Sequence, residues 1–195
     1  NTIGFEIFDE YASFNQKEGL TLITGAPNSA KSDFMFNVMI RLSLRYNWKW
    51  LISSPETGDV EEVYRELLIK LIGKTYNKTK FDKVELMSKD ELDWGMAFLK
   101  EHIYVMESIE LTEYTLDIFI AKVEKAVKKY GINAAVIDPY NAFENAFDGG
   151  NMSNKLNRDL TLLQTSKRKL GINYFVIAHP KSLISTNMTN PYDMM

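Results

Sequence analysis

The fold of this chain is decided by the stretch Thr21-Leu22-Ile23-Thr24-Gly25-Ala26-Pro27-Asn28-Ser29-Ala30-Lys31-Ser32. Strand-forming residues run into the pattern Gly-x-x-x-x-Ala-Lys-Ser, and an apolar segment over residues 34–44 follows at once. This is the P-loop arrangement, in which a strand leads through a loop to the N-terminus of a helix, and the backbone N–H groups of the loop surround phosphates. The stretch therefore predicts a phosphate-binding loop between a strand and a helix.

The residues of this loop form the predicted binding site for ATP and Mg²⁺. Lys31 is expected to reach the β- and γ-phosphates, and Ser32 to offer its hydroxyl to Mg²⁺. Ala30 stands where the pattern has its second glycine; if the site needs a positive φ, alanine there is strained by roughly 1 kcal/mol. The alternative interpretation is a chance Gly/Ser loop before a buried helix. The predicted nucleotide-binding residues are Gly25, Ala26, Pro27, Asn28, Ser29, Ala30, Lys31 and Ser32.

The composition is that of a globular protein of the size of one domain. The chain has 195 residues, 45% of them hydrophobic and 25% charged, and a net charge of −3. That balance argues against a strongly basic nucleic-acid binder, so any contact with nucleic acid has to come from local patches. The absence of cysteine excludes disulfides and thiolate metal sites. Because the first residue is Asn rather than Met, we expect the chain to be a fragment or a processed piece.

Strand and helix signals alternate along the chain, as in a mostly parallel sheet with helices on both faces. We therefore expect an α/β fold that forms a single domain over residues 1–195, without internal repeats. A capping box, Ser88-x-x-Glu91, opens one of the helices, and Gly131 ends another. The predicted strands cover residues 20–25, 50–54, 103–106, 134–138 and 174–178, and the predicted helices cover residues 31–46, 60–72, 88–99, 116–131 and 153–170.

Chemically useful side chains follow the predicted strands, where ligands of open α/β sheets bind. Asp138 follows four apolar residues and is predicted to orient Mg²⁺ and its waters; it also fits as a simple strand end before Pro139. Glu56 is the candidate for activating the attacking water, although Pro-Glu-Thr-Gly is good turn chemistry as well. His179 is the candidate sensor of the γ-phosphate, against the plainer possibility of a structural histidine.

Two polar loops are predicted near the same edge of the sheet, one over residues 142–155 and one over residues 181–190. Lys155, Arg158 and Lys181 supply positive charge there and are the candidate DNA-binding residues. Plain solvated loops explain these residues equally well.

These segments together resemble the RecA-like ATPase domain of DnaB/Twinkle-type replicative ring helicases, above all the helicase part of phage and mitochondrial primase–helicases. The resemblance covers roughly residues 19–193. It rests on the P-loop and on four further stretches in order: Ser54-Pro55-Glu56, Ile137-Asp138-Pro139-Tyr140-Asn141, Ala178-His179-Pro180-Lys181 and Asn190-Pro191-Tyr192-Asp193.

The resemblance implies an ATP-hydrolysing motor that moves along single-stranded DNA as a hexameric homo-oligomer, with primase and polymerase as possible partners and no membrane. It matches Lys31 and Ser32 to the P-loop pair, Glu56 to the catalytic glutamate, Asp138 to the magnesium-site aspartate and His179 to the γ-phosphate sensor. Loops around Asp148 and Thr186 would line the channel of the ring. It also implies a cytoplasmic location in a bacterial cell or a phage-infected host.

Two departures from the family pattern affect these expectations. Ala30 replaces a glycine, and the chain stops at Met195, where the family continues into its last strands and its arginine finger. We therefore expect this chain alone to hydrolyse ATP poorly, because such a finger contributes about 10³–10⁵ in rate in other NTPases.

Three alternative functions remain open at this stage. The site suits another RecA-like ATPase of the recombinase or signalling type, although residues 1–18 are short for a polymerisation segment. It also suits a small-molecule P-loop kinase, which would need lid arginines that the sequence does not concentrate anywhere. A catalytically silent P-loop module is the third.

Overall fold

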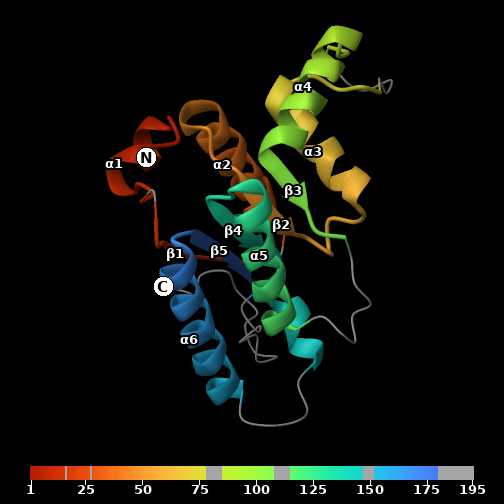
Figure 1. Cartoon of the computed structure of the whole chain (residues 1–195). Coiled ribbons are helices and arrows are strands. Elements are labelled where there is room, and N and C mark those ends of the chain that lie inside the picture. The colour runs from red at the N-terminus through yellow and green to blue at the C-terminus, as the bar shows by residue number, and fades with distance from the viewer. Residues whose placement is uncertain (16, 27, 78–84, 108–114, 147–151, 180–195) are drawn as a thin grey trace, which may run out of the picture.

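Strands and α-helices alternate along the chain, as the sequence predicts, except that two α-helices follow one another between the second and third strands. A computed structural model describes the chain apart from residues 16, 27, 78–84, 108–114, 147–151 and 180–195 (Figure 1). The strands are β1 (Leu20–Thr24), β2 (Trp50–Ser53), β3 (Ile103–Val105), β4 (Ala134–Ile137) and β5 (Asn173–Ala178). The helices are α1 (Glu6–Tyr11), α2 (Lys31–Tyr46), α3 (Val60–Ile72), α4 (Lys89–His102), α5 (Leu116–Tyr130), the 3₁₀ helix η2 (Tyr140–Ala146) and α6 (Met152–Leu170).

The strands form one parallel sheet in the order β1-β5-β4-β2-β3. Strands β1 and β2, which follow one another in sequence, are thus separated by β5 and β4. The carboxyl ends of all the strands consequently lie at one edge of the sheet, where open α/β folds bind their ligands.

Both faces of the sheet are covered by helices, and β4 shows how the sequence achieves this. Ala134 and Val136 belong to a core shared with α2, α3 and α4, whereas Ala135 and Ile137 belong to a second core shared with α5 and α6. Alternate side chains of a strand point to opposite faces, so a strand that is apolar throughout must be covered on both sides. Figure 1 shows this sandwich, with α5 and α6 on the near face.

The helix ends follow the local signals in the sequence. The Ser88 hydroxyl accepts from the backbone N–H of Glu91, and the Glu91 side chain accepts from the N–H of Ser88, which confirms the predicted capping box. Gly131 ends α5 with φ of +66°, the left-handed conformation in which glycine is favoured. Among the described residues, no helix has both the length and the apolar character that crossing a membrane requires.

The structure differs from the sequence prediction in three segments. The sequence signals do not predict helix α1, and α4 extends to His102 rather than ending at Leu99. The predicted loop over residues 142–155 overlaps the predicted helix over residues 153–170; α6 begins at Met152, so the helix prediction is confirmed and Lys155 lies in the helix, not in the loop. The reason is local: Lys155 forms an ion pair with Asp159 one helical turn further on, which stabilises the start of α6.

Candidate nucleotide-binding site

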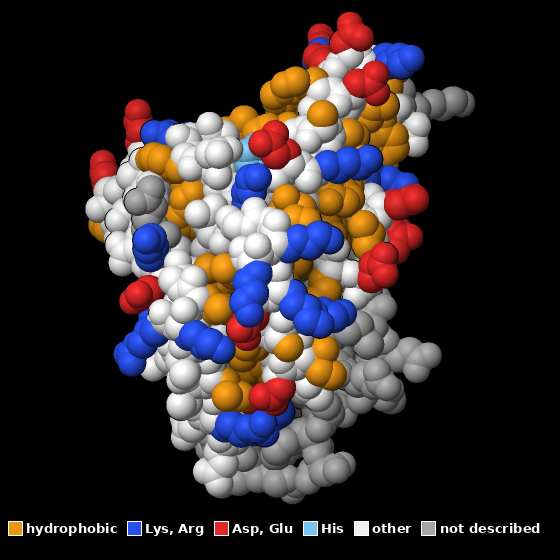
Figure 2. Space-filling model, viewed as in Figure 1, with side chains coloured by type: hydrophobic (Ala, Val, Ile, Leu, Met, Phe, Trp, Pro, Cys, Tyr) orange, Lys and Arg blue, Asp and Glu red, His pale blue; other side chains and the backbone are white. Residues whose placement is uncertain are grey.

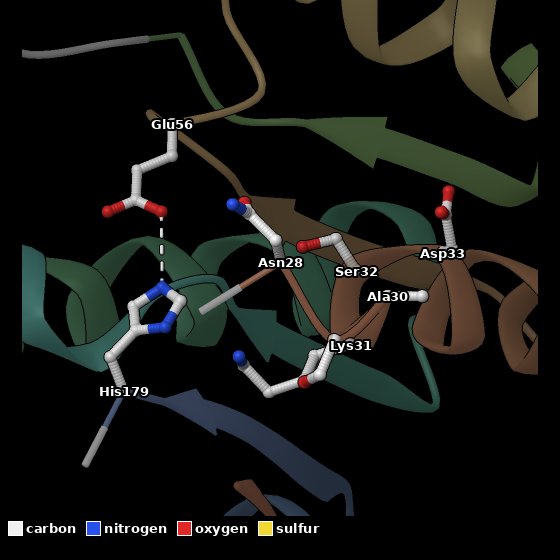
Figure 3. Close-up of a pocket in the computed structure, with 8 residues that line it drawn as sticks. Asn28, Ala30, Lys31, Ser32, Asp33, Glu56 and His179 are labelled. Atoms are coloured by element: carbon white, nitrogen blue, oxygen red, sulfur yellow. Dashed lines mark hydrogen bonds and ion pairs between the residues drawn. The ribbon is translucent and has the colours of Figure 1, made fainter. Parts of the chain in front are cut away.

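A polar cavity of about 410 Å³ lies at the carboxyl edge of the sheet (Figure 3). Its walls come from three separate parts of the chain: the loop after β1 with the start of α2, the segment after β2, and the end of β5. Most of the residues predicted to bind nucleotide, together with Glu56 and His179, are therefore brought to one place. The lining residues are Asn28, Ser29, Ala30, Lys31, Ser32, Asp33, Glu56 and His179.

The loop after β1 turns through two left-handed residues before α2 begins. Asn28 has φ of +60° and Ala30, the N-cap residue of α2, has φ of +56°. Asparagine tolerates this conformation, whereas for alanine it brings Cβ close to the following carbonyl oxygen. The condition under which Ala30 is expected to be strained is thus met.

Replacement of Ala30 by glycine is expected to stabilise the fold by roughly 0.5–1 kcal/mol, because glycine adopts the left-handed conformation without a Cβ contact. Chemical denaturation of the two proteins measures the difference. The matched control is Ala97→Gly, at an exposed position inside α4, where the same exchange should cost about 0.5–1 kcal/mol. Equal destabilisation by both substitutions would show that Ala30 carries no strain.

Lys31 lies inside the curve of the loop. Its side chain is buried, and Nζ donates to the carbonyl oxygens of Gly25 at 3.0 Å and Ala26 at 2.8 Å. These two bonds hold the ammonium group beside the loop on the cavity side, as Figure 3 shows. Pro27, the remaining predicted loop residue, lies outside the described residues.

Asp138 lies next to Ser54 because β4 and β2 are neighbours in the sheet. Ser53 pairs with Ile137 at the end of the ladder. Ser54 and Asp138, the residues that follow them, therefore lie side by side just beyond it. The Ser54 hydroxyl donates to Asp138 Oδ2 at 3.4 Å and lies 2.6 Å from the Thr57 hydroxyl. No local signal in the sequence indicates these contacts of Ser54 and Thr57; the one between Ser54 and Asp138 follows from the strand order.

The buried Asp138 carboxyl has competing influences on its ionisation. The pKa of Asp138 is raised above its usual value, chiefly by burial and to a smaller extent by the nearby charge of Glu56. Hydrogen bonds from Ser32 and Ser54 and the charge of His179 act in the opposite direction but do not cancel the rise. Removal from water disfavours the charged form of a carboxyl group, whereas hydroxyl donors favour that form.

Asp138→Asn is expected to raise the stability of the fold at neutral pH, because an amide carries no charge to desolvate. The pKa of Asp138 is raised in the folded state, so its ionisation costs stability as the pH rises above 3.8, the ordinary value. The gain should therefore be present at neutral pH and vanish in acid, as measured by urea denaturation across pH.

The control for this substitution is Asp117→Asn, at an exposed carboxylate that pairs with Arg158, where the change should stay below about 1 kcal/mol. A less stable Asp138→Asn protein at neutral pH would mean that the hydroxyl bonds outweigh burial.

Glu56 and His179 face one another across the mouth of the cavity (Figure 3). His179 Nε2 lies 3.2 Å from Glu56 Oε2. The Glu56 side chain is 62% exposed, so water reaches the carboxylate. His179 Nδ1 is buried and, within the described part of the chain, has no hydrogen-bond partner. Leaving a buried donor or acceptor without a partner costs free energy, so this nitrogen is a candidate to bond a ligand atom.

The donor set at the cavity fits nucleotide phosphates with Mg²⁺. Within the described residues no three His, Cys, Asp or Glu side chains gather as a metal site. Magnesium at nucleotide sites keeps several waters and takes most other ligands from phosphate oxygens, so few protein groups are needed. The Ser32 hydroxyl, which lines the cavity, and the buried Asp138 carboxyl near it supply such a set.

Two of the three candidate DNA-binding residues, Lys155 and Arg158, lie on α6 and do not line the cavity. The Lys155 side chain is only 12% exposed; its Nζ lies 3.0 Å from Asp159 Oδ2 and above the ring of Tyr140. Arg158 is exposed and pairs with Asp117 at 3.0 Å. Figure 2 shows blue side chains over the part of the surface that α5 and α6 occupy in Figure 1, interspersed with acidic ones. Lys181 lies outside the described residues.

A P-loop before α2, polar strand ends and this parallel strand order define a RecA-like P-loop fold. The solved structure of an ATPase domain from another protein superposes with a TM-score of 0.66, covering 85% of this chain and 58% of that chain at 17% identity. The predicted α/β, RecA-like fold class is thereby confirmed.

Sequence comparison agrees with the resemblance drawn from the motifs. Over 166 residues the chain is 29% identical to the Twinkle homolog protein, chloroplastic/mitochondrial, of Arabidopsis thaliana. The aligned region covers 84% of this chain and 23% of that protein, so the chain spans about a quarter of the length of this curated relative. No family model matches the chain.

Proposed function

We propose that this chain is the ATP-hydrolysing motor domain of a DnaB/Twinkle-type replicative DNA helicase, and that it forms a single RecA-like domain over residues 1–195. The observation that carries the proposal is the meeting of Lys31, Ser32, Glu56 and His179 in one cavity at the carboxyl edge of the sheet. The similarity to a Twinkle homolog and to a solved ATPase domain supports it.

Each group at the cavity has a separate chemical task in this proposal. Lys31 and the loop N–H groups bind the β- and γ-phosphates of ATP, and Ser32 and Asp138 hold Mg²⁺, which neutralises charge on the phosphate oxygens. Glu56 orients the attacking water and accepts its proton. We infer that His179 senses the γ-phosphate, because its Nε2 faces Glu56 and, among the described residues, its Nδ1 has no hydrogen-bond partner.

The same proposal extends to assembly and DNA. The whole protein acts as a ring, and we infer a hexamer in which a neighbouring subunit completes each site. Single-stranded DNA is the track, primase and polymerase are candidate partners, and the proposed location is the cytoplasm of a bacterial cell or a phage-infected host. On α6, Arg158 is better placed than Lys155 to contact a phosphate backbone, because its ion pair with Asp117 is exposed to solvent whereas Lys155 is held in a buried pair with Asp159.

Steady-state ATP hydrolysis by the full-length protein in Mg²⁺, with and without single-stranded DNA, tests this function. We expect a several-fold stimulation by DNA, which a small-molecule kinase would not show. Hydrolysis that is indifferent to DNA would favour another RecA-like role. The absence of hydrolysis in an assembled ring would mean that the P-loop is silent.

A further inference from the structure

Strand β5 runs beyond the end of its neighbour β4. The ladder between them ends at the pair Ile137 and Val176, and the β4 chain continues into Asp138 and Pro139. Proline has no backbone N–H to donate to a ladder. The backbone around His179 therefore needs another partner on this side.

The side chain of Asn141 supplies that partner. Its Oδ1 accepts from the backbone N–H of His179 at 2.8 Å, and its Nδ2 donates to the carbonyl oxygen of His179 at 3.3 Å. Only this orientation of the amide satisfies both groups, because the N–H can only donate and the carbonyl can only accept. The two bonds replace a ladder pair at the residue that carries the sensor ring.

Asn141 is itself held in place by the segment that carries it. The adjacent Tyr140 is buried, and its hydroxyl donates to Asp159 Oδ2 of α6 at 2.6 Å. The backbone N–H of Ala142 donates to the carbonyl oxygen of Pro139 at 3.2 Å. The amide of Asn141 thus projects from a segment anchored to the body of the domain.

We propose that Asn141 is a positioning residue that holds the backbone of His179, and with it the imidazole ring, at the mouth of the nucleotide cavity. The inference rests on the proposed nucleotide chemistry of this cavity. With the backbone of His179 fixed at both its N–H and its carbonyl group, only the side-chain torsions decide where the ring meets Glu56 and the γ-phosphate.

The test compares Asn141→Ala with Asn133→Ala. Asn133 is a matched control, because its Oδ1 also accepts from a backbone N–H, that of Lys49 at 2.8 Å, at the opposite edge of the sheet. The first measurement is amide hydrogen exchange of His179. We expect exchange at this amide to become about tenfold faster in Asn141→Ala through local opening, and to stay unchanged in Asn133→Ala.

The second measurement is the affinity for a non-hydrolysable ATP analogue and for ADP. In Asn141→Ala the affinity for the analogue should fall about tenfold while that for ADP stays within about twofold, since only the analogue has a γ-phosphate for His179. In Asn133→Ala the ratio of the two affinities should stay at its wild-type value.

The outcomes separate this inference from the proposed function. Unchanged exchange at the His179 amide, or an unchanged affinity ratio in Asn141→Ala, would overturn the positioning role. A wild-type chain that binds neither nucleotide would overturn the proposed function. The exchange measurement needs no nucleotide, so it tests the contact between Asn141 and His179 independently of that function. If Asn141→Ala does not fold, the isosteric Asn141→Asp retains the acceptor. The His179 amide should then exchange slowly, and fast exchange would overturn the role.

Discussion

Lys31→Ala is expected to reduce the affinity for ATP by about ten- to a hundredfold, because a charge-assisted hydrogen bond contributes about 1.5–3 kcal/mol. The ammonium group lies against the loop, held by the carbonyl oxygens of Gly25 and Ala26. The lysine also lines the cavity, so its ammonium group can exchange these carbonyl partners for phosphate oxygens without moving to another part of the fold. Titration with a fluorescent ATP analogue measures the loss directly.

The matched control for this prediction is Lys74→Ala. Lys74 is a partly buried lysine outside the cavity lining, and its Nζ pairs with Glu91 and Glu85. Its loss should leave nucleotide affinity unchanged. Because Lys31 also bonds two carbonyl groups, the folded state of each variant has to be checked by thermal denaturation. Nucleotide affinity retained in a folded Lys31→Ala protein would move the phosphate site away from this loop.

Glu56→Gln is expected to separate binding from turnover. An amide cannot accept the proton of the attacking water, so kcat in the full-length protein should fall by about 10²–10⁴ while the affinity for ATP stays close to wild type. The exposed carboxylate lies opposite the P-loop and contributes no phosphate donor. Steady-state kinetics together with direct binding measurements distinguish the two effects.

Glu61→Gln is the control for this substitution, since Glu61 lies on the exposed side of the first turn of α3, outside the cavity. Its kcat should equal that of the wild type. If Lys31→Ala and Glu56→Gln lost binding to the same extent, the assigned division between phosphate binding and water activation would be wrong.

The sequence predicts the elements whose signals are local. The P-loop, the capping box at Ser88 and the glycine end of α5 each depend on a few neighbouring residues, and the structure shows all three. Helix α1 escapes prediction because it has only six residues, and no side chain caps its start. Short helices depend on tertiary contacts more than on intrinsic propensity.

The contacts inside the site can be predicted only in outline. Strand ends indicate that Glu56 and His179 lie on one edge, but their approach across 123 residues depends on the strand order. The role of Asn141 depends on β5 extending beyond the end of β4, and no local signal in the sequence reveals this. Lys155 shows the opposite error: a charge that looks available in the sequence is neutralised by Asp159 in the fold.

The cavity joins chain segments that are remote in sequence, from residue 28 to residue 179. In the unfolded chain these segments are far apart, so only the folded domain brings the proposed phosphate-binding residues together. A ligand that binds only the native state adds to its stability by mass action, about 2.7 kcal/mol at a free concentration one hundred times Kd. Under the proposed function, folding and nucleotide binding are therefore linked equilibria, and we expect resistance to heat to report how much of the protein has its nucleotide bound.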